Sequence, residues 1–492
     1  MNESSKIAEY AKSRFHIENL RPMQKKVIEN IMYCYSNKLN NRLLVLLQTG
    51  GGKSLCFLLP STIVEGITII VYPLLALMKD QKRRLDLSHI SSIIIEGGQS
   101  KQERDRRFKK IEDGSCKIII INPEILLNEI IMDRLRNFDI SLFVIDEAHT
   151  ICEWGLSFRP AYKMLGKQIQ TLHIKQILAF TATADSKTLK ALSKYLFFYE
   201  NYHIIRGGVD RENVLYHLRY SFSKDRELYK ILLNPSLRPA IVFCKSRNDT
   251  RITYHKFKEH AEDIDSFYYH AGLSKLEKKR IEESFFASDS AVLFSTIAFG
   301  LGMDKSNIRC VIHYSIVNTN VLSFLQESGR GGRDGQISHS IVLFGSSEIK
   351  AFLRKNASDD AALLNIYQSD RCIRTGLCSY MGESIKSCSG CDKCSNSLNL
   401  SIDGLDVLIR LLLFHPLLYT KKEIINILHG NEEYNIAHHS FRILVDWLED
   451  DINSLIESCI EVSVLIEFKK HIMLNLIKLH EVMKVLKSNS QL

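Results

Sequence analysis

Short runs of apolar, mostly β-branched residues recur between residues 43 and 344 and alternate with stretches of helical spacing. Strands that alternate with helices predict parallel sheets covered by helices. Runs that are apolar at nearly every position indicate strands buried on both faces. The runs are Leu43–Leu47, Ile67–Tyr72, Ser92–Ile95, Lys117–Ile121, Leu142–Ile145 and Gln176–Phe180, then Ala240–Cys244, Ser266–Tyr269, Ala291–Ser295, Cys310–Tyr314 and Ser340–Phe344. A break at Asn201–Arg211 separates the two sets, so the pattern predicts an α/β protein with two tandem lobes.

After residue 346, helical spacing replaces the strand runs. We therefore predict four domains: lobes at residues 1–200 and 201–346, a small cysteine-containing helical module at 347–398, and a helical tail at 399–492. Within the tail, Leu405–Gly430 has the spacing of a helix-turn-helix that ends at a glycine. Ser440–Leu465 has room for another helix and a short wing. The tail is therefore either a diverged winged helix or a plain helical cap.

The composition is that of a globular protein with a basic excess. The 492 residues are 45% hydrophobic, and 65 Lys and Arg against 56 Asp and Glu give a net charge of +9. This excess suits a polyanionic partner, although many proteins carry it without touching nucleic acid. No apolar run reaches the roughly 18 residues of a membrane span, and the N-terminus lacks the apolar core of a secretory signal. We expect no membrane association, and a cytoplasmic location at the nucleoid or, in a eukaryote, in the nucleus.

A glycine-rich segment, Gln48–Ser54, lies between a predicted strand and an apolar helical stretch. In this context backbone N–H groups at a helix N-terminus converge on phosphate oxygens. Lys53 should reach the β- and γ-phosphates of ATP, and the Ser54 hydroxyl should ligate Mg²⁺. The strict motif has glycine where this chain has Leu47, so an ordinary glycine-rich turn is the alternative. The backbone groups expected around the phosphates belong to Thr49, Gly50, Gly51 and Gly52.

Two further sets of residues fit the same nucleotide. Asp146 and Glu147 begin a DEAH sequence at the end of a predicted strand. Asp146 should hold Mg²⁺, and Glu147 should orient and deprotonate the attacking water. Upstream, Arg21 can stack on adenine, and the Gln24 amide can pair with adenine N6 and N7. The sequence therefore predicts ATP and Mg²⁺ as cofactors.

The second lobe contains two closely spaced arginines in QESGRGGRDG. Arg330 and Arg333 are three residues apart with glycines between them, so their guanidinium groups can enter a tight cleft. Arginines supplied in this way stabilise the charge on a transferring phosphoryl group. A basic surface turn is the alternative interpretation.

Four cysteines have the spacing C-x15-C-x2-C-x2-C: Cys372, Cys388, Cys391 and Cys394. Close cysteine pairs in a protein that is not secreted favour metal binding over disulfides. Four thiolates predict a closed tetrahedral Zn²⁺ site, with unligated thiols as the alternative. Nearby Cys378 is expected to be a packed free thiol. Most other cysteines are interpreted as buried free thiols.

Between residues 15 and 395 the motifs, taken in order, resemble those of the RecQ family of ATP-dependent DNA helicases in superfamily 2. The resemblance rests on LRPMQ, QTGGGKSLCF, YPLLALMKDQ, INPEIL, VIDEAHTICEWGLSFRP, FTATA, IVFCKSR, YHAGL, STIAFGLGMDK, QESGRGGRDG and the RCIR…YMGE…CSGCDKC segment. It implies two RecA-like lobes with ATP between them, and 3′→5′ movement along single-stranded DNA. The implied substrates are single-stranded and tailed duplex DNA, the implied processes are DNA repair, recombination and replication, and the implied state is a monomer.

The same resemblance identifies Ile151–Pro160 as an aromatic-rich loop, with Trp154, Phe158 and Arg159 at the matching positions. Aromatic side chains there can stack on an unpaired base and couple it to the ATP site; packing in a core is the alternative. Two departures from the family weaken a contact each: Leu156 replaces a histidine, and Ile17 replaces an aromatic residue that would stack on adenine. Further implied DNA contacts are Tyr72–Gln81, Lys245 and Arg247.

Two other functions fit part of the sequence. DEAH tetrads also occur in RNA helicases, although the aromatic loop and the four cysteines argue against that class. A zinc-containing protein that binds or anneals nucleic acid without motor activity is the second rival. The presence of every expected catalytic residue argues against it.

Overall fold

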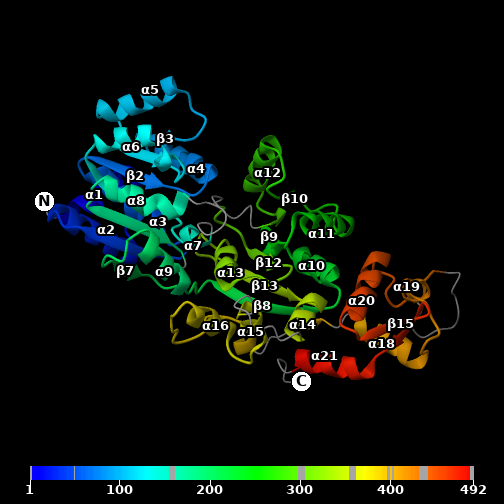
Figure 1. Cartoon of the computed structure of the whole chain (residues 1–492). Coiled ribbons are helices and arrows are strands. Elements are labelled where there is room, and N and C mark those ends of the chain that lie inside the picture. Colours follow the sequence, from blue (N-terminus) through cyan, green and yellow to red (C-terminus); the bar gives the residue numbers. More distant parts are fainter. Residues whose placement is uncertain are drawn as a thin grey trace. The chain divides into compact units, whose positions relative to one another are not determined.

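The computed structural model describes residues 3–48, 50–153, 161–182, 184, 186–296, 305–353, 362–395, 399–401, 404–431 and 442–487. The chain forms two compact units. Unit 1 contains residues 1–210 and 381–383, and unit 2 contains residues 211–380 and 384–492. Figure 1 shows a sheet with helices around it in each unit.

Unit 1 is built on a seven-stranded parallel sheet with the order β3-β4-β2-β5-β6-β1-β7. The six strands predicted for the first lobe are confirmed. β7 was not predicted, because only one of its four residues is buried and its ends are His203 and Arg206. It lies beyond the predicted boundary at residue 200 and pairs with β1. The strands are β1 (Asn41–Leu46), β2 (Ile67–Val71), β3 (Ser92–Ile95), β4 (Ile118–Ile121), β5 (Ile140–Ile145), β6 (Gln176–Thr181) and β7 (His203–Arg206).

Helices cover both faces of this sheet, as its nearly continuous apolar strands require. In β1, Leu43 and Val45 pack in the core on the face of α1–α4, while Leu44 and Leu46 pack in the core formed with α5, α6, α8 and α9. The helices are α1 (Glu3–Phe15), α2 (Pro22–Ser36), α3 (Lys53–Ile63), α4 (Leu75–Leu87), α5 (Lys101–Glu112), α6 (Glu129–Arg136), α7 (Thr150–Glu153), α8 (Ala161–Thr171) and α9 (Ser186–Tyr195), with a 3₁₀ turn at Ile125–Leu127.

Unit 2 contains a second seven-stranded parallel sheet, with the order β10-β11-β9-β12-β13-β8-β14. Its five predicted strands are confirmed. β8 was not predicted, because buried residues alternate there with His217 and Arg219 and the run is not continuously apolar. The strands are β8 (Val214–Ser221), β9 (Ala240–Phe243), β10 (Ser266–Tyr269), β11 (Val292–Ser295), β12 (Cys310–His313), β13 (Ser338–Phe344) and β14 (Asn399–Ser401).

The core of unit 2 continues from this sheet into the rest of the chain. α10 and α11 cover one face, and α12 and α13 cover the other. The cluster around β8 and β13 includes buried residues of α14–α16 and of the tail, so these segments share one core. The helices are α10 (Lys224–Leu233), α11 (Arg247–His260), α12 (Lys275–Ala287), α13 (Val321–Ser328), α14 (Ser346–Leu353), α15 (Ala362–Gln368), α16 (Ile373–Tyr380) and α17 (Asp392–Ser395), with a 3₁₀ turn at Pro235–Leu237.

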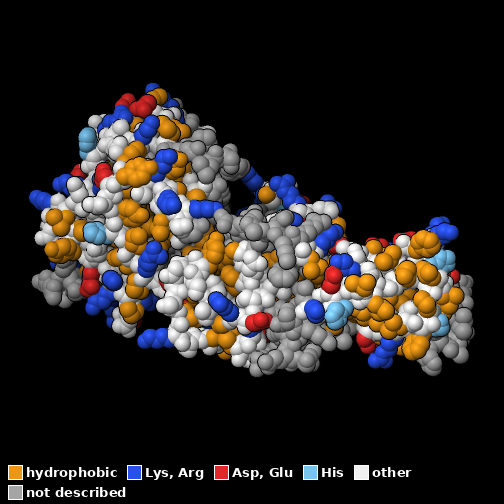
Figure 2. Space-filling view, turned by 60° about the horizontal axis from the view of Figure 1, so that its bottom comes forward, with side chains coloured by type: hydrophobic (Ala, Val, Ile, Leu, Met, Phe, Trp, Pro, Cys, Tyr) orange, Lys and Arg blue, Asp and Glu red, His pale blue; other side chains and the backbone are white. Residues whose placement is uncertain are grey.

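The tail has the element order of a winged helix, one of the two predicted alternatives. Three helices precede an antiparallel hairpin, and Thr420 forms a bridge with His471 of that hairpin. Figure 2 shows many exposed hydrophobic side chains over the tail. The tail's exposed hydrophobic residues include Phe414 and Ile477. Its elements are α18 (Leu405–Phe414), α19 (Lys421–His429), α20 (Glu449–Glu461), β15 (Leu465–Phe468), β16 (His471–Leu474) and α21 (Leu476–Lys487).

Helix α20, the third of the tail's described helices, packs against the second sheet's helices rather than presenting a basic surface. It contains five acidic residues and neither lysine nor arginine. Asp451 accepts a hydrogen bond from His260 of α11 at 2.8 Å, and Glu461 accepts one from Ser346 at 2.9 Å. Among the described helices, none combines the length and hydropathy that a bilayer crossing requires.

Candidate nucleotide site and four-cysteine cluster

The glycine-rich segment connects β1 to α3, which begins at Lys53. Gly50 and Gly52 have positive φ angles of 81° and 76°, in the left-handed region that favours glycine. A Cβ atom at Gly52 would lie 2.1 Å from Nε2 of Gln24, so a larger residue there would have to displace the Gln24 side chain. The first turn of α3 therefore follows an open loop of backbone groups, as a phosphate site requires. Thr49 lies outside the described residues.

The two residues predicted to recognise adenine lie against this loop. Arg21 Nη1 donates to the carbonyl of Gly50 at 2.6 Å. Gln24 Nε2 lies 3.4 Å from the carbonyls of Gly51 and Gly52, and its Oε1 accepts from the Arg21 backbone at 2.9 Å. The start of α2 is thus held against the loop, although neither contact itself identifies a base.

The paired carboxylates stand at the end of β5 in the same unit. The Asp146 backbone donates to the carbonyl of Val71 at 3.0 Å, and the Lys53 ammonium lies 3.7 Å from Oε1 of Glu147. Asp146 is 7% exposed. Burial, followed by the adjacent charge of Glu147, raises the pKa of Asp146 to about 7, while Lys53 opposes the shift. Lys53, Asp146 and Glu147, which the sequence analysis placed in one site, are brought together by the fold.

Two residues to which the sequence analysis gave no role orient Glu147. His149 Nδ1 forms a 2.9 Å hydrogen bond with the Thr181 hydroxyl and lies 3.4 Å from Oε2 of Glu147. Thr181 ends β6, which lies between β5 and β1 in the sheet. The signal available in the sequence was the FTATA motif that contains Thr181. The buried hydrogen bond between His149 and Thr181 therefore places His149 beside Oε2 of Glu147, while Oε1 of Glu147 is the oxygen near Lys53.

The donor set near the loop fits Mg²⁺, which prefers oxygen ligands. The Asp146 carboxylate at the end of β5 and the Ser54 hydroxyl in the first turn of α3 are side chains of this donor class. The pKa of Asp146 is raised because its negative charge is buried beside that of Glu147. A divalent cation bound here would offset the repulsion between these two charges.

The predicted arginine pair lies in unit 2, immediately after α13. Arg330 is buried and Arg333 is half-buried. Gly332 between them has a φ of 56°, and a Cβ there would meet the Gln336 carbonyl at 2.4 Å. The loop is therefore a tight turn whose glycine is required by both conformation and space.

The predicted DNA-contacting segments differ in exposure. Within Tyr72–Gln81, Leu75 and Lys79 are exposed, whereas Tyr72 is buried. Lys245 and Arg247, after β9, are both exposed. Trp154, Phe158 and Arg159, the residues predicted for the aromatic-rich loop, lie outside the described residues.

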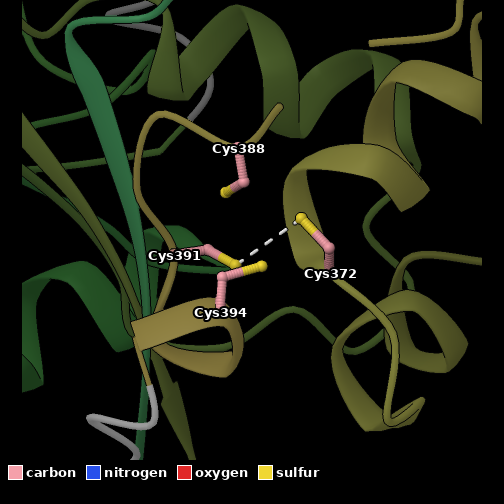
Figure 3. Close-up of side chains that lie close together, drawn as sticks. All are labelled: Cys372, Cys388, Cys391 and Cys394. Carbon is pink, nitrogen blue, oxygen red and sulfur yellow. Dashed lines mark hydrogen bonds between the residues drawn. The ribbon is translucent and has the colours of Figure 1, made fainter. Parts of the chain in front are cut away.

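The four cysteines predicted to bind zinc form one cluster (Figure 3), in which their sulfurs point toward a common centre. All four Sγ atoms lie within 4.8 Å of one another, and those of Cys372 and Cys391 are 3.7 Å apart. With metal–sulfur bonds of about 2.3 Å, sulfurs at the corners of a tetrahedron are about 3.8 Å apart. The cluster is therefore compatible with zinc. Cys378 is buried outside the cluster, as predicted.

Two family models match the chain. The family described as "DEAD/DEAH box helicase" matches residues 21–192, and "Helicase conserved C-terminal domain" matches residues 223–335. Among solved structures, the DUF1998 helicase MrfA bound to DNA has a TM-score of 0.58 at 18% identity, covering 96% of this chain and 59% of that one. The DEAD-box helicase Mss116 bound to single-stranded RNA has a TM-score of 0.55 at 19% identity, covering 72% and 76%. At these identities the likeness shows the fold alone.

Curated relatives identify the family more specifically than the two helicase domain models do. The ATP-dependent DNA helicase RecQ of Bacillus subtilis is 32% identical over 71% of this chain, and that of Pasteurella multocida is 30% identical over 77%. This chain spans 61% of the length of each. Each of these matches covers a larger share of this chain than the two domain models together, which span residues 21–192 and 223–335. The chain belongs to the RecQ family of superfamily 2 helicases.

Proposed function

We propose that this protein is an ATP-dependent DNA helicase that moves 3′→5′ on single-stranded DNA and unwinds tailed duplexes in repair, recombination or replication. The observation that carries the proposal is the contact between Lys53 and Glu147 beside the buried Asp146. These residues lie at the carboxyl ends of strands β1 and β5. The relatives named as DNA helicases support DNA as the substrate.

In the proposed mechanism, the backbone of Thr49–Gly52 and the Lys53 ammonium bind the phosphates of ATP. Glu147 orients the attacking water and accepts its proton, and His149 holds the carboxylate in position from the opposite side. Arg330 and Arg333 stabilise charge on the transferring phosphoryl group. Asp146 and Ser54 would hold Mg²⁺, which would further neutralise that charge.

On the nucleic-acid side, Lys245 and Arg247 provide exposed cations for backbone phosphates. Salt should weaken such binding, because phosphate neutralisation releases counterions. We propose that Trp154 and Phe158 stack on bases, with Arg159 beside them. We also propose that the protein acts as a monomer, at the nucleoid or in a nucleus.

We further propose that Cys372, Cys388, Cys391 and Cys394 bind one structural Zn²⁺. A closed four-thiolate site leaves no position for substrate, so its role is to stabilise the module rather than to catalyse.

The test compares ATP hydrolysis with single-stranded DNA, duplex DNA and RNA, and strand displacement from 3′-tailed and 5′-tailed duplexes. Lys53→Ala and Glu147→Gln should both reduce turnover by about 10²-fold or more, since each removes a group that acts in the chemical step. Glu147→Gln should still bind ATP, because it retains Lys53 and the phosphate loop.

Stimulation by single-stranded DNA and displacement of 3′-tailed duplexes are the expected results. Stronger stimulation by RNA would support the RNA-helicase alternative. Annealing without ATP turnover would support a binding protein, and wild-type hydrolysis in Glu147→Gln would show that the site is placed wrongly.

A further inference from the structure

A buried arginine in unit 2 clamps the loop that carries Arg330. Arg211 donates through Nη1 to the carbonyl of Gly329 at 2.6 Å and through Nη2 to the carbonyl of Gly332 at 2.7 Å. These two carbonyls bracket Arg330 in the chain. One planar guanidinium group therefore fixes the backbone on both sides of Arg330.

A second arginine connects this clamp to the four-cysteine module. Arg374 lies on α16 and is completely buried. Its Nη1 donates to the Arg211 carbonyl at 3.0 Å, and its Nη2 donates to the carbonyls of Val214 and Gly390. Gly390 is the neighbour of Cys391 in the cluster. Hydrogen bonds thus link the cysteine module through Arg374 to the backbone of Arg211, and the Arg211 side chain continues the link to the loop.

The clamped loop has little freedom of its own. Asn213, two residues after Arg211, donates to the carbonyls of Gly332 and Gln336, both at 2.8 Å. Burying a guanidinium group is unfavourable unless its N–H groups have acceptors. Burial of Arg211 and Arg374 therefore stabilises the backbone conformation in which the carbonyls accept their hydrogen bonds. The same bonds that solvate the two charges therefore set the position of the loop.

We propose that Arg211 and Arg374 are positioning residues for ATP hydrolysis, through which the folded four-cysteine module sets the placement of Arg330. The proposal rests on the ATPase function proposed above and adds two residues that act through Arg330 without touching nucleotide. A shift of about 1 Å at a reacting group can lower a rate about 10²-fold. Loss of the clamp should accordingly lower kcat while leaving nucleotide binding at Lys53 intact.

The first variant to test is Arg211→Lys, because one ammonium group cannot reproduce a fork that reaches two carbonyls. We expect kcat for ATP to fall about tenfold or more, with KM changed by less than about twofold. Arg374→Lys should lower kcat in the same direction by a smaller factor. Arg42→Lys is the matched control: Arg42 donates to the carbonyls of Ile174 and Lys175 at the opposite end of β1, and its loss should leave kcat unchanged.

Chemical rescue distinguishes positioning from stability. Arg211→Ala is assayed with added guanidinium chloride and, separately, with sodium chloride at equal ionic strength, and melting temperatures are measured for every variant. Recovery of kcat with guanidinium alone supports the proposal. Wild-type kcat in Arg211→Lys overturns the proposal. It is also overturned if the melting temperature and kcat fall together, KM rises, and guanidinium does not restore kcat. Absence of ATP hydrolysis in the unmodified protein would overturn the proposed function, and this proposal with it.

Discussion

Glu147 combines a catalytic assignment with an unfavourable backbone conformation. Its φ is 49°, a region in which a residue with a side chain costs on the order of 1–3 kcal/mol. Its N–H donates to Asp146 Oδ1 at 2.9 Å, and its carbonyl accepts from the Thr150 hydroxyl at 2.8 Å. The residues on either side thus hold Glu147 in the conformation that turns its carboxylate toward Lys53.

Gly52 provides a prediction that separates backbone strain from steric clash. Gly52→Ala places a methyl group 2.1 Å from Gln24 Nε2, whereas Gly98 has a similar φ of 81° with nothing within 4 Å. Gly98→Ala should therefore cost only the left-handed strain of about 1–2 kcal/mol. Gly52→Ala should lose more stability and also weaken ATP binding, as urea unfolding and nucleotide titration would measure. Equal effects of the two variants on both quantities would contradict this account.

At this scale the sequence predicted residues that belong to a local motif. Lys53 and Asp146 lie beside other members of their motifs, and the four cysteines lie within 23 residues of one another, so local spacing indicated them. His149 and Thr181 are 32 residues apart, and Arg374 is 163 residues from Arg211. Such pairs depend on strand order and burial, which spacing does not contain.

Among the elements, strands with continuous apolar runs were predictable and those with mixed faces were not. β4 is four consecutive isoleucines, all buried. β8 alternates buried and half-buried positions, and His217 in it hydrogen-bonds Asp392 beside the cysteine cluster at 2.7 Å. His217 thus hydrogen-bonds residues from later in the chain, Asp392 and His339. The local pattern therefore did not indicate a buried strand.

The contact between α11 and α20 predicts a pH dependence of tail docking. Burial opposes the charge on His260, but its hydrogen bonds to Asp451 and to the Lys256 carbonyl outweigh burial and raise the pKa. A raised pKa in the folded state contributes stability that is complete below the unfolded value of about 6.5 and is lost as pH rises through the folded value. Protection of α20 amides in hydrogen exchange should therefore decrease from pH 6 toward pH 8.

His260→Gln should flatten this dependence, because glutamine keeps a donor for Asp451 but does not titrate. His480→Gln changes an exposed histidine of α21 and should preserve it. An unchanged pH profile in His260→Gln would assign the effect to other groups around this contact, such as Asp225, Asp450 or Arg226.

The four-cysteine cluster predicts metal content. Purified protein should contain about one Zn²⁺ per chain, following from the four-thiolate geometry. Cys391→Ser should lose the metal and should lower solubility and DNA binding more than ATP binding, since the phosphate loop belongs to unit 1. Cys378→Ser, which alters a buried cysteine outside the cluster, should retain the metal. A metal-free wild-type protein that is fully folded would refute the zinc assignment.

For the molecule as a whole, the two-lobe α/β architecture followed from the order of the strand runs, and the element order of a winged helix was one of two alternatives predicted for the tail. The sequence contained less information about how these parts join. Unit 2 includes the second sheet, the cysteine module and the tail around one continuous core. Contacts between apolar residues far apart in the chain create that core, and no local spacing reports them.

Coupling between DNA and ATP is a prediction at this scale. The aromatic positions follow α7, which begins at Thr150 and is thus continuous with the DEAH segment. Replacing Trp154 and Phe158 together by alanine should sharply reduce DNA-stimulated hydrolysis and unwinding, since each stacked base is worth about 1–3 kcal/mol. Basal hydrolysis should change little, and DNA affinity only modestly, because phosphate contacts dominate it. A parallel fall in melting temperature and basal rate would instead indicate that both side chains are part of a core.

The position of β8 has a consequence for synthesis of the chain. Both strands that pair with β8 come much later: β13 begins at Ser338 and β14 at Asn399, whereas β8 ends at Ser221. At about 5–20 residues per second, a ribosome needs roughly 6–23 s to reach β13 after completing β8. During that interval a strand with five buried positions has no pairing edge from its own sheet. The nascent chain is therefore exposed to aggregation or chaperone binding at this segment before the second sheet can close.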